Sequence, residues 1–306
     1  MTSTPFPQPT PPAPRPAPAP PLRWFITGAS GGLGRELVQT ALDAGDSVIA
    51  TVRRSDTLRG LAEAYPELLT VEQLDLTDAS AVNQTVSRVT ATPGRIDVVV
   101  NNAGYSIVGA TEEMTDAQLD HQLAILLRAP IQITRAFLAP MREQGGGRII
   151  QLSSVGGQIT TPASSAYHAG KWGLEGFTEA LAQEVAEFGI YPTIVEPGAM
   201  RTNFAANIQT TTPTPAYEHG AVATFRQWVT TAGPEVYTGD PAKVARAIFD
   251  TTRDPQPLLR LTLGADAYNM IHTALRNRLD NLEAQQELAH SVAFNTVTSP
   301  PTNSQP

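Results

Sequence analysis

The chain has 306 residues, 41% of them hydrophobic, which is enough for one large α/β domain with its own core. It contains no cysteine, so disulfides, thiolate metal sites and cysteine nucleophiles are excluded, and we expect no metal site. The net charge of −8 argues against a broadly basic nucleic-acid surface. No apolar run approaches the ~20 residues that span a bilayer. We therefore expect a cytoplasmic protein with no nucleic-acid partner and no membrane span.

The two ends differ in composition from the rest. Residues 5–21 alternate proline with alanine and polar residues, which is typical of polyproline II or disorder. They lack the apolar core of a signal peptide, so we interpret them as a retained tail, either solubilising or bound by a proline-reading module. We predict a tail over 1–21, one folded domain over 22–294 and a loose tail over 295–306.

Between the tails, strand and helix patterns alternate. Strands are predicted at Trp24–Ile26, Ser47–Val52, Leu68–Leu74, Ile96–Val100, Arg148–Leu152, Thr193–Val195 and Leu258–Leu263. Helices are predicted at Arg35–Leu42, in a stretch ending at Tyr65, and at Ala79–Thr90, Thr115–Glu143, Ser164–Phe188 and Pro241–Thr251. Apolar strands that alternate with helices indicate an α/β fold with a doubly wound parallel sheet.

A glycine-rich turn follows the first strand and opens into the first helix. Its pattern is Thr27-Gly28-x-x-x-Gly32-x-Gly34, with Ser30 and Leu33 inside it. Glycine permits a tight turn and a close approach of the backbone, and unpaired N–H groups at a helix N-terminus attract phosphate. The pattern predicts a phosphate or pyrophosphate site, although an ordinary turn has the same composition.

In a doubly wound sheet the ligand binds beyond the carboxyl ends of the strands. The residues that follow the predicted strands include Asp75, Asn101–Gly104, Ser153-Ser154 and Pro197-Gly198. These residues, together with the glycine turn, resemble the motifs of the short-chain dehydrogenase/reductase family, in its compact single-domain branch. The resemblance extends to Tyr167-His168-Ala169-Gly170-Lys171 and to Thr202. The resemblance covers residues 22–265. It implies a Rossmann-type three-layer αβα domain, a carbonyl or alcohol substrate and a homodimer or homotetramer.

Tyr167 and Lys171 are the candidate catalytic pair, with Ser154. Four residues apart on a helix, Tyr167 and Lys171 share one face. A nearby ammonium favours the phenolate, so we expect it to lower the tyrosine pKa, and Ser154 is placed to hold a carbonyl or alcohol oxygen against Tyr167. Without other motifs, Tyr167 and Lys171 would be interpreted as two ordinary solvated side chains on one helix face. The catalytic interpretation rests mainly on the family resemblance.

The cofactor preference is predicted from the end of the second strand. The resemblance places Val52 where a carboxylate would bind the ribose of NAD, and Arg53-Arg54 follow. A guanidinium binds a 2′-phosphate, so NADP(H) is favoured over NAD(H), unless the arginines only solvate a loop. The resemblance further implies adenine contacts at Asp75 and Leu76, ribose contacts at Asn102 to Gly104, and a carboxamide contact at Thr202. The full predicted cofactor site is Thr27, Gly28, Ser30, Gly32, Leu33, Gly34, Arg53, Asp75, Leu76, Asn102, Ala103, Gly104, Tyr167, Lys171, Pro197, Gly198 and Thr202.

The segment 199–237 corresponds to the family's variable substrate lid. It carries Phe204, Tyr217, Phe225 and Trp228, which fit either an apolar substrate pocket or a small core beneath a long loop. Glu112-Glu113 are interpreted as a solvated approach to a helix and not as a catalytic pair.

Leu126 departs from the family pattern, which usually has an asparagine there. The alternative function is therefore a nucleotide-binding redox sensor or scaffold with weak turnover. The family's asparagine is thought to hold a relay water through its backbone carbonyl. Pro130 has no N–H, so the helix cannot close its bond to the Leu126 carbonyl, which predicts a kink and a free oxygen there.

Overall fold

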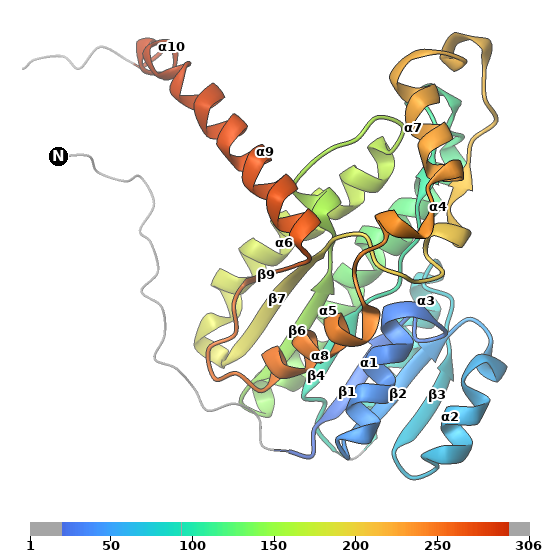
Figure 1. Cartoon of the computed structure of the whole chain (residues 1–306). Helices are drawn as coiled ribbons and strands as arrows, with labels where there is room; N and C mark the ends of the chain where they lie inside the picture. Colours follow the sequence, from blue (N-terminus) through green and yellow to red (C-terminus); the bar gives the residue numbers. More distant parts are fainter. Residues whose placement is uncertain (1–19, 93, 294–306) are drawn as a thin grey trace, which may run out of the picture.

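The computed structural model describes residues 20–92 and 94–293, so the two predicted tails lie almost wholly outside the described residues. Seven parallel strands form one sheet in the order β3-β2-β1-β4-β6-β7-β9 (Figure 1). Their bounds are β1 (Arg23–Thr27), β2 (Ser47–Val52), β3 (Leu69–Gln73), β4 (Val98–Asn101), β6 (Gly147–Leu152), β7 (Ile190–Pro197) and β9 (Arg260–Leu263). The strand order reverses between β1 and β4, so the sheet is doubly wound, as the sequence predicts.

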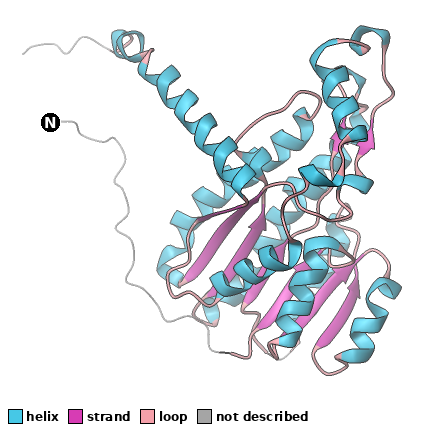
Figure 2. Cartoon of the chain, in the orientation of Figure 1, coloured by secondary structure: helices cyan, strands magenta, loops and turns pink. Residues whose placement is uncertain are grey.

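Helices cover both faces of the sheet (Figure 2). On one face lie α1 (Gly32–Asp43), α2 (Arg59–Ala64) and α8 (Pro241–Thr252); on the other lie α3 (Ala79–Ala91), α5 (Ala129–Glu143) and α6 (Ser165–Val185). Trp24 and Ile26 of β1 pack into the hydrophobic core beneath α1, α2 and α8, and Phe25 packs into the core beneath α3, α5 and α6. Successive side chains of a strand point to opposite faces, so a strand buried on both sides is apolar throughout.

The predicted helix Thr115–Glu143 is interrupted. It consists of α4 (Asp116–Leu123), a π-helical turn η3 (Ala124–Arg128) and α5. By length and composition alone, Asp116–Glu143 is apolar enough to cross a membrane, with a mean hydropathy of 1.2. Core helices of soluble proteins pass the same test, and α5 packs on the sheet beside α3. The absence of a membrane span stays an expectation.

Several elements were not predicted. They are α7 (Gly220–Thr231), α9 (Ala265–Glu283), α10 (Gln286–Ser291), and a small parallel sheet of β5 (Ile107–Val108) and β8 (Gln209–Thr210). Short 3-10 turns are η1 (Ser55–Leu58), η2 (Thr111–Glu113), η4 (Val155–Gly157), η5 (Ala186–Phe188), η6 (Ala205–Asn207), η7 (Pro215–Tyr217) and η8 (Pro234–Val236). Helix α9 runs away from the sheet (Figure 1), and its buried residues are Ala267 and Ile271.

Candidate active site

The glycine turn packs closely against the segment after β4. Gly28 has φ +67°, and a Cβ there would lie 2.7 Å from Cα of Ala103. A Cβ on Gly34 would lie 2.5 Å from Nδ2 of Asn102. At Gly32, with φ +53°, a Cβ would lie 3.2 Å from Cβ of Thr202. The three glycines therefore allow the turn, Asn102-Ala103 and Thr202 to meet at one edge of the sheet.

Thr27 and Asn102 fix this arrangement through hydrogen bonds. The Thr27 hydroxyl accepts from the backbone N–H of Asn102 at 3.0 Å and of Ala103 at 3.2 Å. The Asn102 amide donates to the carbonyls of Thr27 at 2.9 Å and Gly28 at 3.1 Å. The Asn102 side chain thus holds the turn in shape, whereas the resemblance implies a direct ribose contact.

Arg53 and Asp75 lie near each other beyond the ends of β2 and β3. Arg53 is exposed, and its charge helps to lower the Asp75 pKa. The main cause of that shift is Thr77, whose N–H and hydroxyl donate to the Asp75 carboxylate at 2.9 and 2.8 Å. Leu76 is buried and Ser30 is exposed. A cation and an anion are therefore both present at the edge where the sequence predicts the adenine end of the cofactor.

Ser154, Tyr167 and Lys171 come together from η4 and α6. The side chain of Ser154 makes a hydrogen bond with Tyr167 and also accepts from the N–H of Gly156 at 3.1 Å. Lys171 is buried, and its Nζ lies 5.8 Å from the centre of the Tyr167 ring. That Nζ donates to the Leu152 carbonyl at 2.6 Å. The three predicted catalytic side chains therefore form one group.

The pKa of Tyr167 differs from the sequence expectation. Burial raises it, and the hydrogen bond with Ser154 opposes this only in part. Burial also lowers the pKa of Lys171 to about 8, against the field of the Glu175 carboxylate. Desolvation disfavours both charged forms, and this outweighs the expected stabilisation of the phenolate by the ammonium. A protonated tyrosine is the form that donates a proton.

Pro197 and Gly198 lie where β7 ends, beside α9. The N–H of Gly198 donates to the Leu263 carbonyl at 2.9 Å, and the N–H of Ala199 donates to the Asp266 carboxylate at 2.8 Å. A Cβ on Gly198 would overlap the Asp266 carboxylate. Asp266 lies in the first turn of a helix that was not predicted, and no motif singled it out.

The segment 199–237 reaches Tyr167 at one end. The Phe204 ring lies 6.3 Å from the Tyr167 ring, centre to centre, and is 39% exposed. Phe225 and Trp228 of α7 pair at 5.6 Å, and Trp228 is 48% exposed. Because Phe204 and Trp228 retain much exposed surface, they do not form a buried satellite core.

The interpretation of Glu113 as solvated is wrong. Its side chain is fully buried and accepts hydrogen bonds from the N–H groups of Ala110 at 3.0 Å and Thr214 at 2.7 Å. Arg226 of α7 forms an ion pair with it. Burial acts to raise the Glu113 pKa, but the hydrogen bonds outweigh it and lower the pKa to about 2. Glu113 thus joins η2 to the segment 199–237.

Leu126 lies in the π-helical turn, where the N–H of Ala129 donates to the Ala124 carbonyl. The helix is therefore interrupted by a π turn just before Pro130, and the free carbonyl oxygen of Leu126 stays a prediction. The Leu126 side chain is buried: a Cβ on Gly170 would lie 2.9 Å from its Cβ. A Cβ on Gly104 would lie 3.2 Å from Leu126 and 3.8 Å from Nζ of Lys171. An apolar side chain therefore lies beside Lys171, the candidate catalytic lysine.

A sequence model of the family described as short chain dehydrogenase matches residues 23–213. The chain is a short-chain dehydrogenase/reductase. It is 39% identical over 246 residues to the oxidoreductase BOA17 of Botryotinia fuckeliana, covering 80% of this chain and 89% of that one. A 3-ketodihydrosphingosine reductase of Bacteroides thetaiotaomicron is 32% identical over 239 residues, covering 78% and 86%. The crystal structure of a short-chain dehydrogenase from Streptomyces avermitilis has a TM-score of 0.82 and 40% identity, covering 89% and 98%.

Members of this family are NAD(P)-dependent oxidoreductases, and the residues of this short-chain dehydrogenase/reductase fit a dinucleotide. The glycine turn presents backbone at a helix N-terminus, and a Cβ on Gly31 would meet no atom within 4 Å. Gly28 and Gly34, by contrast, have no room for a side chain. The turn is therefore closely packed on its inner side and open at Gly31, as a cradle for a pyrophosphate requires.

Proposed function

We propose that this enzyme interconverts a carbonyl and an alcohol with NADP(H), on a hydrophobic substrate, with Tyr167 as general acid and base. The observation that carries the proposal is the grouping of Ser154, Tyr167 and Lys171, with Phe204 beside Tyr167. The exposed aromatic side chains of 199–237 support an apolar substrate. The similarity to a protein named as a reductase supports assays in the direction of reduction.

The roles of the side chains follow from their chemistry. When bound, the reduced nicotinamide supplies the hydride that the carbonyl carbon accepts. Ser154 donates a hydrogen bond to the carbonyl oxygen and holds it near Tyr167. Tyr167 transfers its phenolic proton to that oxygen, which completes the alcohol, and the Lys171 ammonium stabilises the remaining tyrosinate. In oxidation the proton returns along the same path.

NADP(H) is the cofactor we propose, because of Arg53. Its side chain is exposed beyond β2 beside Asp75, and Val52, where NAD-binding members would carry a carboxylate, is buried and apolar. A guanidinium forms two parallel hydrogen bonds with a phosphate, and no carboxylate at Val52 repels it. The remaining contacts we propose are those predicted above from the glycine turn to Thr202.

The alternative function is a redox sensor or scaffold with weak turnover. Leu126 favours it, because this side chain cannot hydrogen-bond and lies beside Lys171. The two functions separate in one assay, in which carbonyl and alcohol panels are offered with NADPH or NADP and the absorbance of the reduced nicotinamide is followed. Turnover that Tyr167→Phe abolishes supports the enzyme. Tight NADPH binding without turnover on any substrate supports the sensor. Light scattering tests the expected homodimer or homotetramer.

A further inference from the structure

The segment 152–161, which carries Ser154, is held against α6 by a series of hydrogen bonds from successive helix residues. Lys171 donates to the Leu152 carbonyl, and Ser154 pairs with Tyr167. His168 contacts the Gly156 carbonyl through Nδ1 at 2.8 Å. Its Nε2 accepts from the N–H of Thr161 at 2.9 Å, so Nδ1 is the donor. Each of these helix residues binds the segment, and two of them are the catalytic pair.

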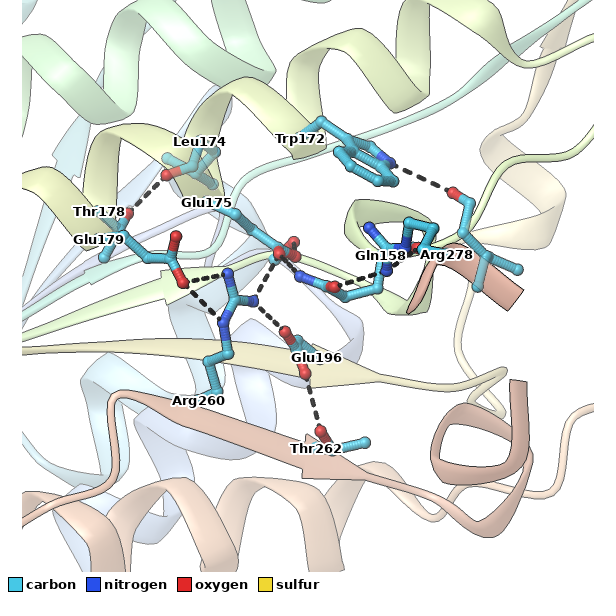
Figure 3. A network of polar contacts seen from close by, with 12 residues as sticks. Gln158, Trp172, Leu174, Glu175, Thr178, Glu179, Glu196, Arg260, Thr262 and Arg278 are labelled. Atoms are coloured by element: carbon cyan, nitrogen blue, oxygen red, sulfur yellow. Dashed lines mark hydrogen bonds and ion pairs between the residues drawn. The ribbon is translucent and has the colours of Figure 1, made fainter. Parts of the chain in front are cut away.

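Glu175 continues this series one helical turn beyond Lys171. Its buried carboxylate accepts hydrogen bonds from the Ser153 hydroxyl and the Gln158 amide, which flank Ser154 (Figure 3 shows the Gln158 and Arg260 contacts). A Cβ on Gly157 would overlap this carboxylate. The backbone of the segment therefore lies directly against Glu175, on both sides of the catalytic serine.

Arg260 of β9 holds the carboxylate from the other side. Its Nη1 contacts Glu175 at 2.6 Å and also pairs with Glu196 of β7 (Figure 3). Its Nη2 contacts Glu179 at 2.8 Å. Glu196 also accepts from the Thr262 hydroxyl at 2.7 Å. One guanidinium thus contacts two buried carboxylates and a third that is half exposed, so three carboxyl groups share one cation.

Lys171 lies on α6 together with two of these carboxyl groups, Glu175 and Glu179. Glu175 lies four residues after Lys171, on the same face, and its charge acts on the lysine against the effect of burial. The other groups placed against Lys171 are the Tyr167 ring, the Leu126 side chain, Gly104 and the Leu152 carbonyl. Of these, only Tyr167 titrates, and burial keeps it neutral.

We propose that Glu175, held by Arg260, is a positioning residue of the active site: it fixes Ser153–Gln158 against α6 and supplies the negative charge opposite the Lys171 ammonium. The inference rests on the proposed function in so far as Ser154 and Lys171 act there. It adds a residue that touches neither substrate nor cofactor. Arg260 sets how much of the carboxylate's field reaches the lysine.

The test uses the two lysines of the chain, Lys171 and Lys243. Protein labelled with ¹³C at the lysine ε-carbon gives two resonances, which Lys243→Arg assigns. Lys243 is exposed and serves as internal reference. The midpoint of Lys171 is measured without cofactor in the full-length protein and in Glu175→Gln, Glu179→Gln and Arg260→Gln. Since no turnover is needed, the outcome is independent of whether the protein proves to be an oxidoreductase for a given substrate.

We expect the Lys171 midpoint to be near pH 8 in the wild type. Glu175→Gln removes the opposing charge and should lower the midpoint by about 0.5 unit or more. Glu179→Gln also loses an Arg260 contact, but it lies two turns from Lys171 and should leave the midpoint within about 0.2 unit. Arg260→Gln removes the positive charge that offsets the Glu175 carboxylate, so it should raise the titration midpoint of Lys171. This opposite sign keeps the proposal testable if Glu175→Gln does not fold.

A purely structural role predicts another pattern. It would lower the melting temperature of Glu175→Gln and Arg260→Gln without shifting Lys171 in opposite directions. An unchanged midpoint in folded Glu175→Gln, or a lowered midpoint in Arg260→Gln, would overturn the proposal. Where turnover is measurable, the alkaline limb of the rate profile should move with the midpoint in each variant.

Discussion

At the scale of single residues, Arg53 is proposed to decide which cofactor binds. The wild type should bind NADPH at least ~10-fold more tightly than NADH, which is ~1.4 kcal/mol and modest for a charge-assisted contact. Arg53→Ala should remove most of that difference, and the neighbouring Arg54→Ala should retain it. Titration calorimetry with both cofactors measures the dissociation constants. Equal constants in the wild type would refute the preference.

Residue types and spacings predicted the grouping of the candidate catalytic side chains, but they did not reveal the electrostatics of that group. Tyr167, Lys171 and Ser154 come together as the motifs indicate, because the helix spacing and the strand end fix their positions. The raised tyrosine pKa depends on burial, which a sequence does not show. Glu175 was missed, although its spacing of four from Lys171 is visible in the sequence. Only the fold shows that β9 brings Arg260 to it.

At the scale of elements, the π-helical turn carries Leu126, at the position where the family usually has an asparagine. If the backbone carbonyl of Leu126 holds the relay water, the side chain matters little, and Leu126→Asn should change kcat by less than ~10-fold, or ~1.4 kcal/mol of barrier. Steady-state kinetics with NADPH measures this. A gain of two orders of magnitude would show that the native protein is an impaired catalyst and would favour the sensor.

The segment 199–237 is attached to the domain through Glu113, whose carboxylate receives bonds from Thr211, Thr214 and Arg226. Glu113→Gln should destabilise the protein by about 2 kcal/mol at pH 7, as expected for hydrogen bonds to a charged group. The Glu113 pKa is lowered to about 2, so this stabilisation is complete above its ordinary value of 4.5 and lost as the pH falls toward 2.

Thermal unfolding of the wild type and Glu113→Gln across this pH range measures the difference. The gap between the two melting temperatures should be largest at neutral pH and should close between pH 4.5 and 2. Glu218→Gln is the matched control, since Glu218 is an exposed carboxylate of the same segment. A gap that is constant with pH would mean that the carboxylate charge of Glu113 does not hold the segment.

The elements that sequence patterns predicted are those of the sheet and of the helices packed on it. Strands such as β1 and β4 are buried on both faces, which leaves continuous apolar runs in the sequence. Helices α7 and α9 bury few side chains, so their apolar residues do not mark a core-facing stripe. The strands β5 and β8 have two residues each, which is too short for a period of two to appear.

At the scale of the whole molecule, three parts of the chain meet around Ser154. Helix α6 holds the segment after β6, β9 contributes Arg260 to Glu175, and α9 contributes Arg278, which donates to the Gln158 carbonyl at 3.0 Å (Figure 3). The site therefore depends on residues from the middle to the end of the chain, although the matched family region ends at residue 213.

The central claim is that Tyr167 transfers the proton in an NADPH-dependent carbonyl reduction. The most direct test compares wild type and Tyr167→Phe on a panel of hydrophobic ketones and aldehydes, following the loss of NADPH absorbance, with NADPH affinity measured in parallel. The account predicts turnover by the wild type and its abolition in Tyr167→Phe, with NADPH affinity within a few-fold because the ring remains. A near-normal kcat in Tyr167→Phe would contradict it.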